Sequence, residues 1–191
     1  MAWLVKVGVS AYLTQSEMEN NAAEFYGYFN SKGFTIESVA GMLGNLQQES
    51  NINPGMKQTA SATSGWGLIQ WTPSSNLTDY ATAHGADWAT GEIQTQLIWD
   101  EIINGYGEQW KPKPALGYSY TGEEFSKLTS VEEACKAYLY ERERAGVQAL
   151  SNRLRYASNW YEYLTGVTPP TPPTPTKRKR MPVWMMCRPL F

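Results

Sequence analysis

A glutamate at the end of an apolar helical pattern is the best candidate in this sequence for acid chemistry. Val39, Met42 and Leu46 recur at helical spacing, and Glu49 follows Leu46 on the flank of the same face. A carboxylic acid in apolar surroundings keeps its proton at neutral pH because burial raises its pKa, and it can then protonate a glycosidic oxygen. Spacing alone fits more simply an ordinary glutamate that solvates the end of a helix.

The residues for metal and nucleophile chemistry are largely missing. The chain has one histidine, His84, whereas a zinc hydrolase usually needs two or more histidines or clustered cysteines. Serine and cysteine nucleophiles usually need a histidine base, and pairing His84 with Cys135 would require an accident of folding. We therefore expect a solvent-facing histidine. No glycine-rich phosphate loop is present. Carboxylate chemistry remains, and we expect neither a metal nor a cofactor.

Composition limits the class of partner. With a net charge of −2 over 191 residues, the chain has no overall basic field that would attract nucleic acid. Its eight tryptophans and twelve tyrosines fit either a well-filled core or a groove in which sugar CH faces pack on aromatic rings. Cys135 and Cys187 lie in different parts of the chain, so we expect free thiols. Residues 1–13 lack the features of a signal peptide, and no apolar run is long enough to span a membrane.

Two predicted helices lead up to Glu49. A capping box at Thr14–Glu17 starts the first helix, and Gly33 ends it. Thr35 caps the second helix, which carries the glutamate. Since glycine is a poor helix former, two glycines inside this second helix predict the close approach of another backbone: Gly41 and Gly44.

The rest of the chain predicts a mainly helical domain with one small β insertion. A polar loop is expected over 50–64, a small β element over 65–71, and a longer loop over 107–120. Further helices are expected over 75–83, 90–105, 130–139 and 147–164. The predicted fold class is therefore α+β, mainly α.

The composition changes sharply at Thr168. We predict a domain over 1–167, an extended Thr/Pro-rich linker over 168–176, and a basic, apolar tail over 177–191. The tail has three interpretations: docking on a neighbouring protein subunit, contact with an anionic membrane surface, or no role.

Three sequence blocks resemble, in the same order, the phage tail lysozyme family. They are GMLGNLQQESNINP at 41–54, GWGLIQWT at 65–72 and AYLYERER at 137–144. The resemblance covers roughly 14–164, and its most specific part is Glu-Ser followed about twenty residues later by Gly-Leu-x-Gln. It implies a lysozyme-like helical domain with a small β-hairpin or sheet lining a cleft, related to goose-type lysozymes and lytic transglycosylases.

The resemblance also implies roles for individual residues. Glu49 would be the general acid, Ser50 would support the loop behind it, and Gln70 would face the cleft to hold substrate or water. Trp71 would stack on sugars or fill the core. Tyr138 is similar in position to an aromatic residue that lines the cleft in relatives, and a core tyrosine fits the pattern equally well.

A second carboxylate is not identifiable from the sequence. Inverting glycosidases place a base across the cleft to activate water, and retaining enzymes use a closer nucleophile. Asp79 and Glu141 are the candidates, with an ordinary surface acid as the alternative for each. Several members of the superfamily use one catalytic glutamate, and without an effective base the same site can form an anhydro sugar.

The resemblance therefore implies a phage muramidase that cleaves the β-1,4 bonds of bacterial peptidoglycan, either for wall penetration from the virion tail or for host lysis as an endolysin. One alternative is a lytic transglycosylase. Another is a non-catalytic tail protein that binds peptidoglycan. The expected partners are peptidoglycan and, through residues 177–191, other phage tail proteins, and the expected location is the virion or the host cytoplasm before lysis.

Overall fold

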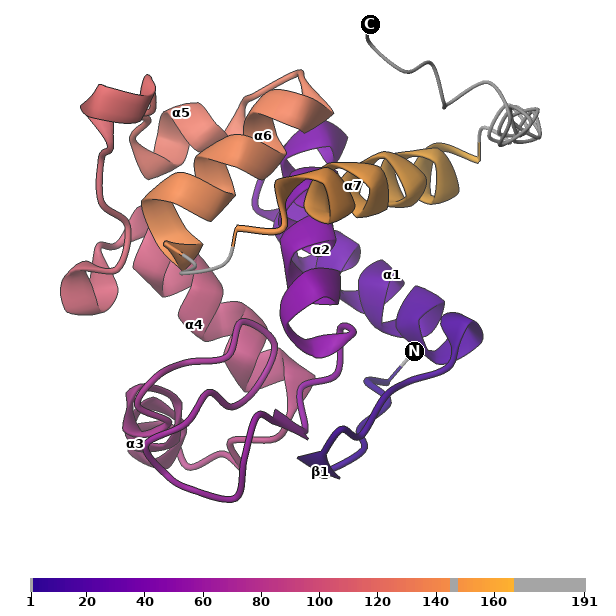
Figure 1. Cartoon of the computed structure of the whole chain (residues 1–191), viewed down its shortest axis with the longest axis vertical. Helices are drawn as coiled ribbons and strands as arrows, with labels where there is room; N and C mark the ends of the chain where they lie inside the picture. Colours follow the sequence, from indigo (N-terminus) through magenta and orange to yellow (C-terminus); the bar gives the residue numbers. More distant parts are fainter. Residues whose placement is uncertain (1, 145–147, 167–191) are drawn as a thin grey trace, which may run out of the picture.

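The computed structural model describes residues 2–144 and 148–166, which form a mainly helical domain (Figure 1). Its α-helices are α1 (Gln15–Ser31), α2 (Ile36–Ser50), α3 (Ser75–Ala83), α4 (Gly91–Ile103), α5 (Gly122–Ser126), α6 (Val131–Ala137) and α7 (Leu150–Thr165). Strands β1 (Gly8–Val9) and β2 (Met56–Lys57) pair in parallel. Two 3₁₀ turns, η1 (Tyr106–Glu108) and η2 (Pro114–Leu116), and a π-helix, η3 (Tyr138–Glu143), complete the set. The predicted fold class is confirmed.

Helix α2 is the centre of the domain. Its residues 38–46 are all buried, and it packs most extensively against α7 and α6, with further contacts to α1 and η3. Figure 1 shows α7 crossing α2, while α3 and the loops after α2 lie beyond its C-terminal end. Because burial on all sides requires an apolar surface all round, the helix holds only small or apolar residues over most of its length.

The two glycines of α2 allow neighbouring helices to approach its backbone. A Cβ atom at Gly41 would lie 2.6 Å from the backbone nitrogen of Cys135 in α6. At Gly44 it would lie 2.5 Å from the carbonyl oxygen of Arg153 and 2.7 Å from the Cβ of Ala157, both in α7. The close approach predicted from the sequence is confirmed at both positions.

The helix starts also match their sequence signals. Thr14 forms a complete capping box with Glu17, and the Thr35 side chain accepts a hydrogen bond from the backbone of Ser38. Helix α7 begins at Leu150, after Ala149 in a left-handed conformation, and the predicted start at Val147 lies outside the described residues. Residues 167–191, with the predicted linker and tail, also lie outside them.

The predicted β element over 65–71 is reduced to isolated bridges. Trp66 bridges to Lys57 and to Trp71, but positive φ angles at Gly67 (81°) and Gln70 (53°) turn the chain before a ladder can extend. The small sheet instead pairs residues 8–9 with residues 56–57. Within the described residues, no helix is long and apolar enough to cross a bilayer.

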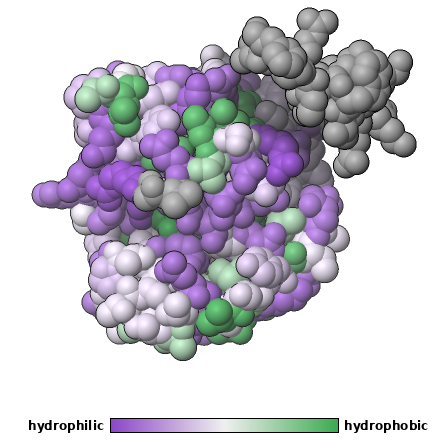
Figure 2. All heavy atoms as spheres, viewed as in Figure 1, coloured by the Kyte–Doolittle hydropathy of each residue, from purple (hydrophilic) through white to green (hydrophobic). Residues whose placement is uncertain are grey.

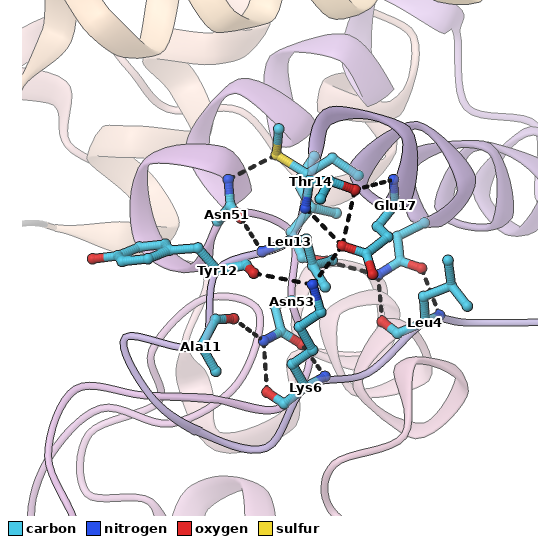
Figure 3. Close-up of polar contacts among 12 residues, drawn as sticks. Leu4, Lys6, Ala11, Tyr12, Leu13, Thr14, Glu17, Asn51 and Asn53 are labelled. Carbon is cyan, nitrogen blue, oxygen red and sulfur yellow. Dashed lines mark hydrogen bonds and ion pairs between the residues drawn. The ribbon is translucent and has the colours of Figure 1, made fainter.

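The segment that follows Glu49 is tied to the N-terminal arm of the chain (Figure 3). The Asn51 side chain accepts a hydrogen bond from the Leu13 backbone at 2.5 Å. The Asn53 side chain donates to the carbonyl oxygens of Lys6, at 2.7 Å, and Ala11, at 2.6 Å. These bonds fix the end of α2 and the loop beyond it in place.

We predict opposite effects on stability for two Gly→Ala substitutions. Gly44→Ala forces a methyl group against the α7 backbone and is expected to destabilise the domain by about 1–3 kcal/mol. Gly27→Ala is the matched control, because nothing lies within 4 Å of a Cβ atom added at this exposed position of α1. It is expected to stabilise by up to about 1 kcal/mol through helix propensity. Urea unfolding followed by circular dichroism measures both, and equal stability of Gly44→Ala and wild type would contradict the packing argument.

Candidate active site

A groove of about 930 Å³ opens where α2 ends. The last turn of α2, the end of η3 and the start of α7 line the groove, together with strand β2, two residues that follow β1 (Ser10 and Tyr12) and the segment 69–72. Figure 2 shows hydrophilic residues across the band between the helices and the loops. The lining includes Glu49, Gln70, Trp71, Glu143, Arg153 and Tyr156.

Glu49 forms an ion pair with Arg153 of α7. The glutamate side chain is 20% exposed at the groove, whereas the arginine side chain is 2% exposed. Arg153 also donates to the Asn45 side chain at 3.0 Å and to the Gln148 carbonyl at 2.8 Å. All three groups hold the guanidinium in one orientation, so the groove end of α2 carries a glutamate in its carboxylate form against a fixed cation.

Glu143, the last residue of η3, is a second carboxyl group in the same groove. Its Oε1 atom is buried and has no hydrogen-bond partner. Burial and the negative charge of Glu49 raise the pKa of Glu143 to about 8, against the opposite effect of Arg142 and Arg153. At neutral pH this side chain therefore carries a proton.

A buried ion pair holds η3 against α4 beside the groove. Arg142 donates through Nε to Glu101 of α4 at 2.7 Å, and both side chains are at most 7% exposed. The other Glu101 oxygen accepts a hydrogen bond from the Trp71 indole at 2.9 Å. Because breaking a buried pair leaves an uncompensated charge, this network holds η3, α4 and the groove wall together.

The predicted substrate-binding residues separate into two groups. Gln70 and Trp71 line the groove, although Trp71 is only 3% exposed and its indole nitrogen is used by Glu101. Ser50 and Tyr138 are buried and do not line the groove, so neither can contact a substrate in this conformation. Ser50 donates to the Leu68 carbonyl at 2.7 Å and thereby ties the end of α2 to the loop.

Neither candidate for the second carboxylate reaches the groove. Asp79 lies on the exposed face of α3. Glu141 is buried elsewhere on η3, where its Oε1 accepts a hydrogen bond from the Tyr120 backbone at 2.9 Å. The second carboxyl group in the groove is Glu143, which was not predicted from the sequence. The only sequence signal for Glu143 was its place in the 137–144 block. A π-helix has a different periodicity from an α-helix, so α-helical spacing does not predict which side chains of that block share a face.

Cys135 and His84 lie outside the groove, and Cys187 lies outside the described residues. His84 is exposed at the end of α3, where its Nδ1 pairs with the Tyr80 carbonyl at 2.8 Å. Cys135 is a buried free thiol in α6, and burial raises its pKa to about 12. A thiol with so high a pKa is a poor nucleophile.

We predict that the stability of the domain falls as the pH rises between about pH 5 and about pH 8. Burial raises the pKa of Glu141 to about 7 and that of Glu143 to about 8, well above that of a glutamate in an unfolded chain. The folded state therefore binds more protons in this window, and its advantage is lost as the pH rises through the folded pKa values. Thermal unfolding of wild type and of the Glu141→Gln, Glu143→Gln double variant checks this, and the variant should show a smaller decline.

Comparison with known proteins places the groove within a described family. The family model for phage tail lysozymes matches residues 20–164, which include α2, η3 and most of α7. The chain is also 34% identical over 161 residues to "Morphogenesis protein 1" of Bacillus phage B103. This similarity covers 82% of the chain but only 42% of the relative, so the chain spans about two fifths of that protein. The protein described here belongs to the phage tail lysozyme family.

Proposed function

We propose that this chain is a phage-encoded glycosidase that cleaves the β-1,4 bonds of bacterial peptidoglycan with Glu49 as its general acid. One observation carries the proposal: in a member of the phage tail lysozyme family, the glutamate at the end of the buried helix α2 lines the large polar groove. A lysozyme-type function follows from the family, and the substrate and the role of Glu49 are our proposal.

The lining of the groove suits a polysaccharide. Carboxamide side chains both donate and accept hydrogen bonds, as sugar hydroxyl and N-acetyl groups require. Several line the groove: Gln47, Gln48, Asn51, Gln58, Gln70, Asn76 and Gln109. A groove of about 930 Å³ is near the upper end of the range for small-molecule sites, as expected for a polymer that enters and leaves along its length.

The ion pair with Arg153 fits an acid that gives up its proton. As the glycosidic oxygen takes a proton, Glu49 becomes a carboxylate and positive charge develops at the sugar ring. The fixed guanidinium of Arg153 stabilises the carboxylate product of that step without reorganising. The proton must reach Glu49 beforehand, which requires a donor nearby.

The biological setting that we propose is local penetration of the host wall by the virion. The family is one of phage tail proteins, and the B103 relative is named as a morphogenesis protein. Residues 177–191 would then dock on other tail proteins. Release into the host cytoplasm as an endolysin is the alternative setting.

A lytic transglycosylase is the second candidate function. It is favoured by the absence of both Asp79 and Glu141 from the groove lining, which removes the two bases predicted from the sequence. In that case a hydroxyl group of the substrate, in place of water, attacks the sugar carbon and forms an anhydro ring.

We predict that Glu49→Gln lowers the rate of wall clearing by at least about 100-fold, because the amide cannot donate a proton to the leaving oxygen. Glu37→Gln, at the opposite end of the same helix, is the matched control and should keep wild-type activity. Turbidity loss of purified cell walls measures both. Equal clearing by Glu49→Gln and wild type would refute the assignment, and tight wall binding without clearing by wild type would indicate a binding protein.

We predict that digestion releases muropeptides with reducing ends, since the carboxamides beside Glu49 can hold a water molecule for attack. Mass spectrometry of the digest separates reducing ends from anhydro ends, which differ by one water. A digest made up of anhydro products would establish the transglycosylase instead.

A further inference from the structure

Two of the three buried polar atoms that lack a hydrogen-bond partner, within residues 2–144 and 148–166, lie close to Glu49. They are the Tyr138 hydroxyl and the Glu143 Oε1, and the charge of Glu49 raises the pKa values of both groups. The third, Glu141 Oε2, lies away from the groove. An unpaired buried carboxyl oxygen costs folding free energy, so its presence beside a candidate acid calls for a functional explanation.

Burial favours the protonated form of Glu143, and the charges around it favour the same form. Four charged groups and Tyr138 surround it: Glu49 from α2, Glu101 from α4, Arg142 from η3 and Arg153 from α7. Arg142 pairs with Glu101 and Arg153 pairs with Glu49. Both cations are thus already matched, and the cluster is neutral only when Glu143 carries a proton.

The neighbouring Arg144 is a further cation that interacts with the charges of Glu101 and Glu143. It is exposed, and its guanidinium donates to the Gln109 side chain at 2.9 Å. Solvent screens an exposed charge much more than a buried one, so Arg144 contributes little to the form that Glu143 takes.

We propose that Glu143 is the second carboxyl group of this site and stores the proton that Glu49 delivers to the glycosidic oxygen. This inference rests on the proposed glycosidase function. At rest Glu49 is paired with the fixed guanidinium of Arg153, so it needs another group to supply the proton that it delivers. Glu143 can supply it, because its carboxyl group lies in the same groove and forms no ion pair within the described residues.

The proposed step balances in atoms and charge. The proton passes from Glu143 to Glu49 and from Glu49 to the glycosidic oxygen, whose bond to the sugar carbon breaks as that oxygen keeps the electron pair. Water then attacks the carbon, forms the new C–O bond and returns one proton to the carboxyl pair. The pair ends as it began, with one proton shared between two carboxyl groups.

The test compares two glutamates of the same π-helix. Glu143→Gln should lower kcat/KM by about 10- to 100-fold and move the alkaline limit of activity to lower pH, because the stored proton is gone. Glu143→Asp, which keeps a carboxyl group, should recover part of the activity. Glu141→Gln is the matched control, since Glu141 is also a buried carboxyl with a raised pKa but lies outside the groove, and its pH profile should match that of wild type.

Infrared spectroscopy tests the stored proton without turnover. In wild type, one carbonyl stretch of a protonated carboxylic acid should titrate near pH 8, beside a second one from Glu141 near pH 7, and only the first should be absent in Glu143→Gln. In Glu49→Gln the first stretch should titrate at lower pH, because the neighbouring negative charge has been removed.

The outcomes separate this inference from the function on which it rests. An active enzyme whose pH profile is unchanged by Glu143→Gln, or whose Glu143 is ionised at neutral pH, overturns the proton store and leaves the glycosidase intact. A wild-type protein that clears no walls overturns the glycosidase and the delivery step together.

Discussion

The ion pair between Glu49 and Arg153 is the contact on which the groove depends. It joins the last turn of α2 to α7, two helices that also touch through Gly44. The close backbone approach brings the buried arginine near enough to reach both Asn45 and Glu49 from the same position. A larger residue at Gly44 would move α7 away, and the cation would move with it. Packing in the core thus sets the electrostatics of the groove.

Around that contact the structure keeps buried charges balanced. Arg142 and Arg153 each pair with a glutamate, and the other carboxyl group of the groove, Glu143, is neutral at pH 7. Burying these charges costs desolvation free energy, so the ion pairs are weak evidence for a gain in stability. It does produce two carboxyl groups in different protonation states within one groove, which is the separation of roles that glycoside cleavage uses.

Much of the fold could be predicted from local sequence signals. The caps at Thr14 and Thr35 were correct because each depends on neighbours in sequence. The predicted β element at 65–71 was only partly correct, since Gln70 adopts a positive φ angle, which cannot be predicted from a glutamine in the sequence. Glu49 and Gln70 were placed in one groove by resemblance, and the structure brings both to its lining.

The sequence by itself determined the helical class, the central helix with its two close-packed glycines, and carboxylate chemistry as the chemistry available. Only the tertiary structure decided which carboxyl group shares the groove with Glu49. Glu141 and Glu143 are two residues apart, and the π-helical turn, with Arg142 anchored to Glu101, sends one toward Tyr120 and the other toward the groove. Glu143 lies on η3, which is far from Glu49 in the chain, so the spacing of residues around Glu49 holds no information about it.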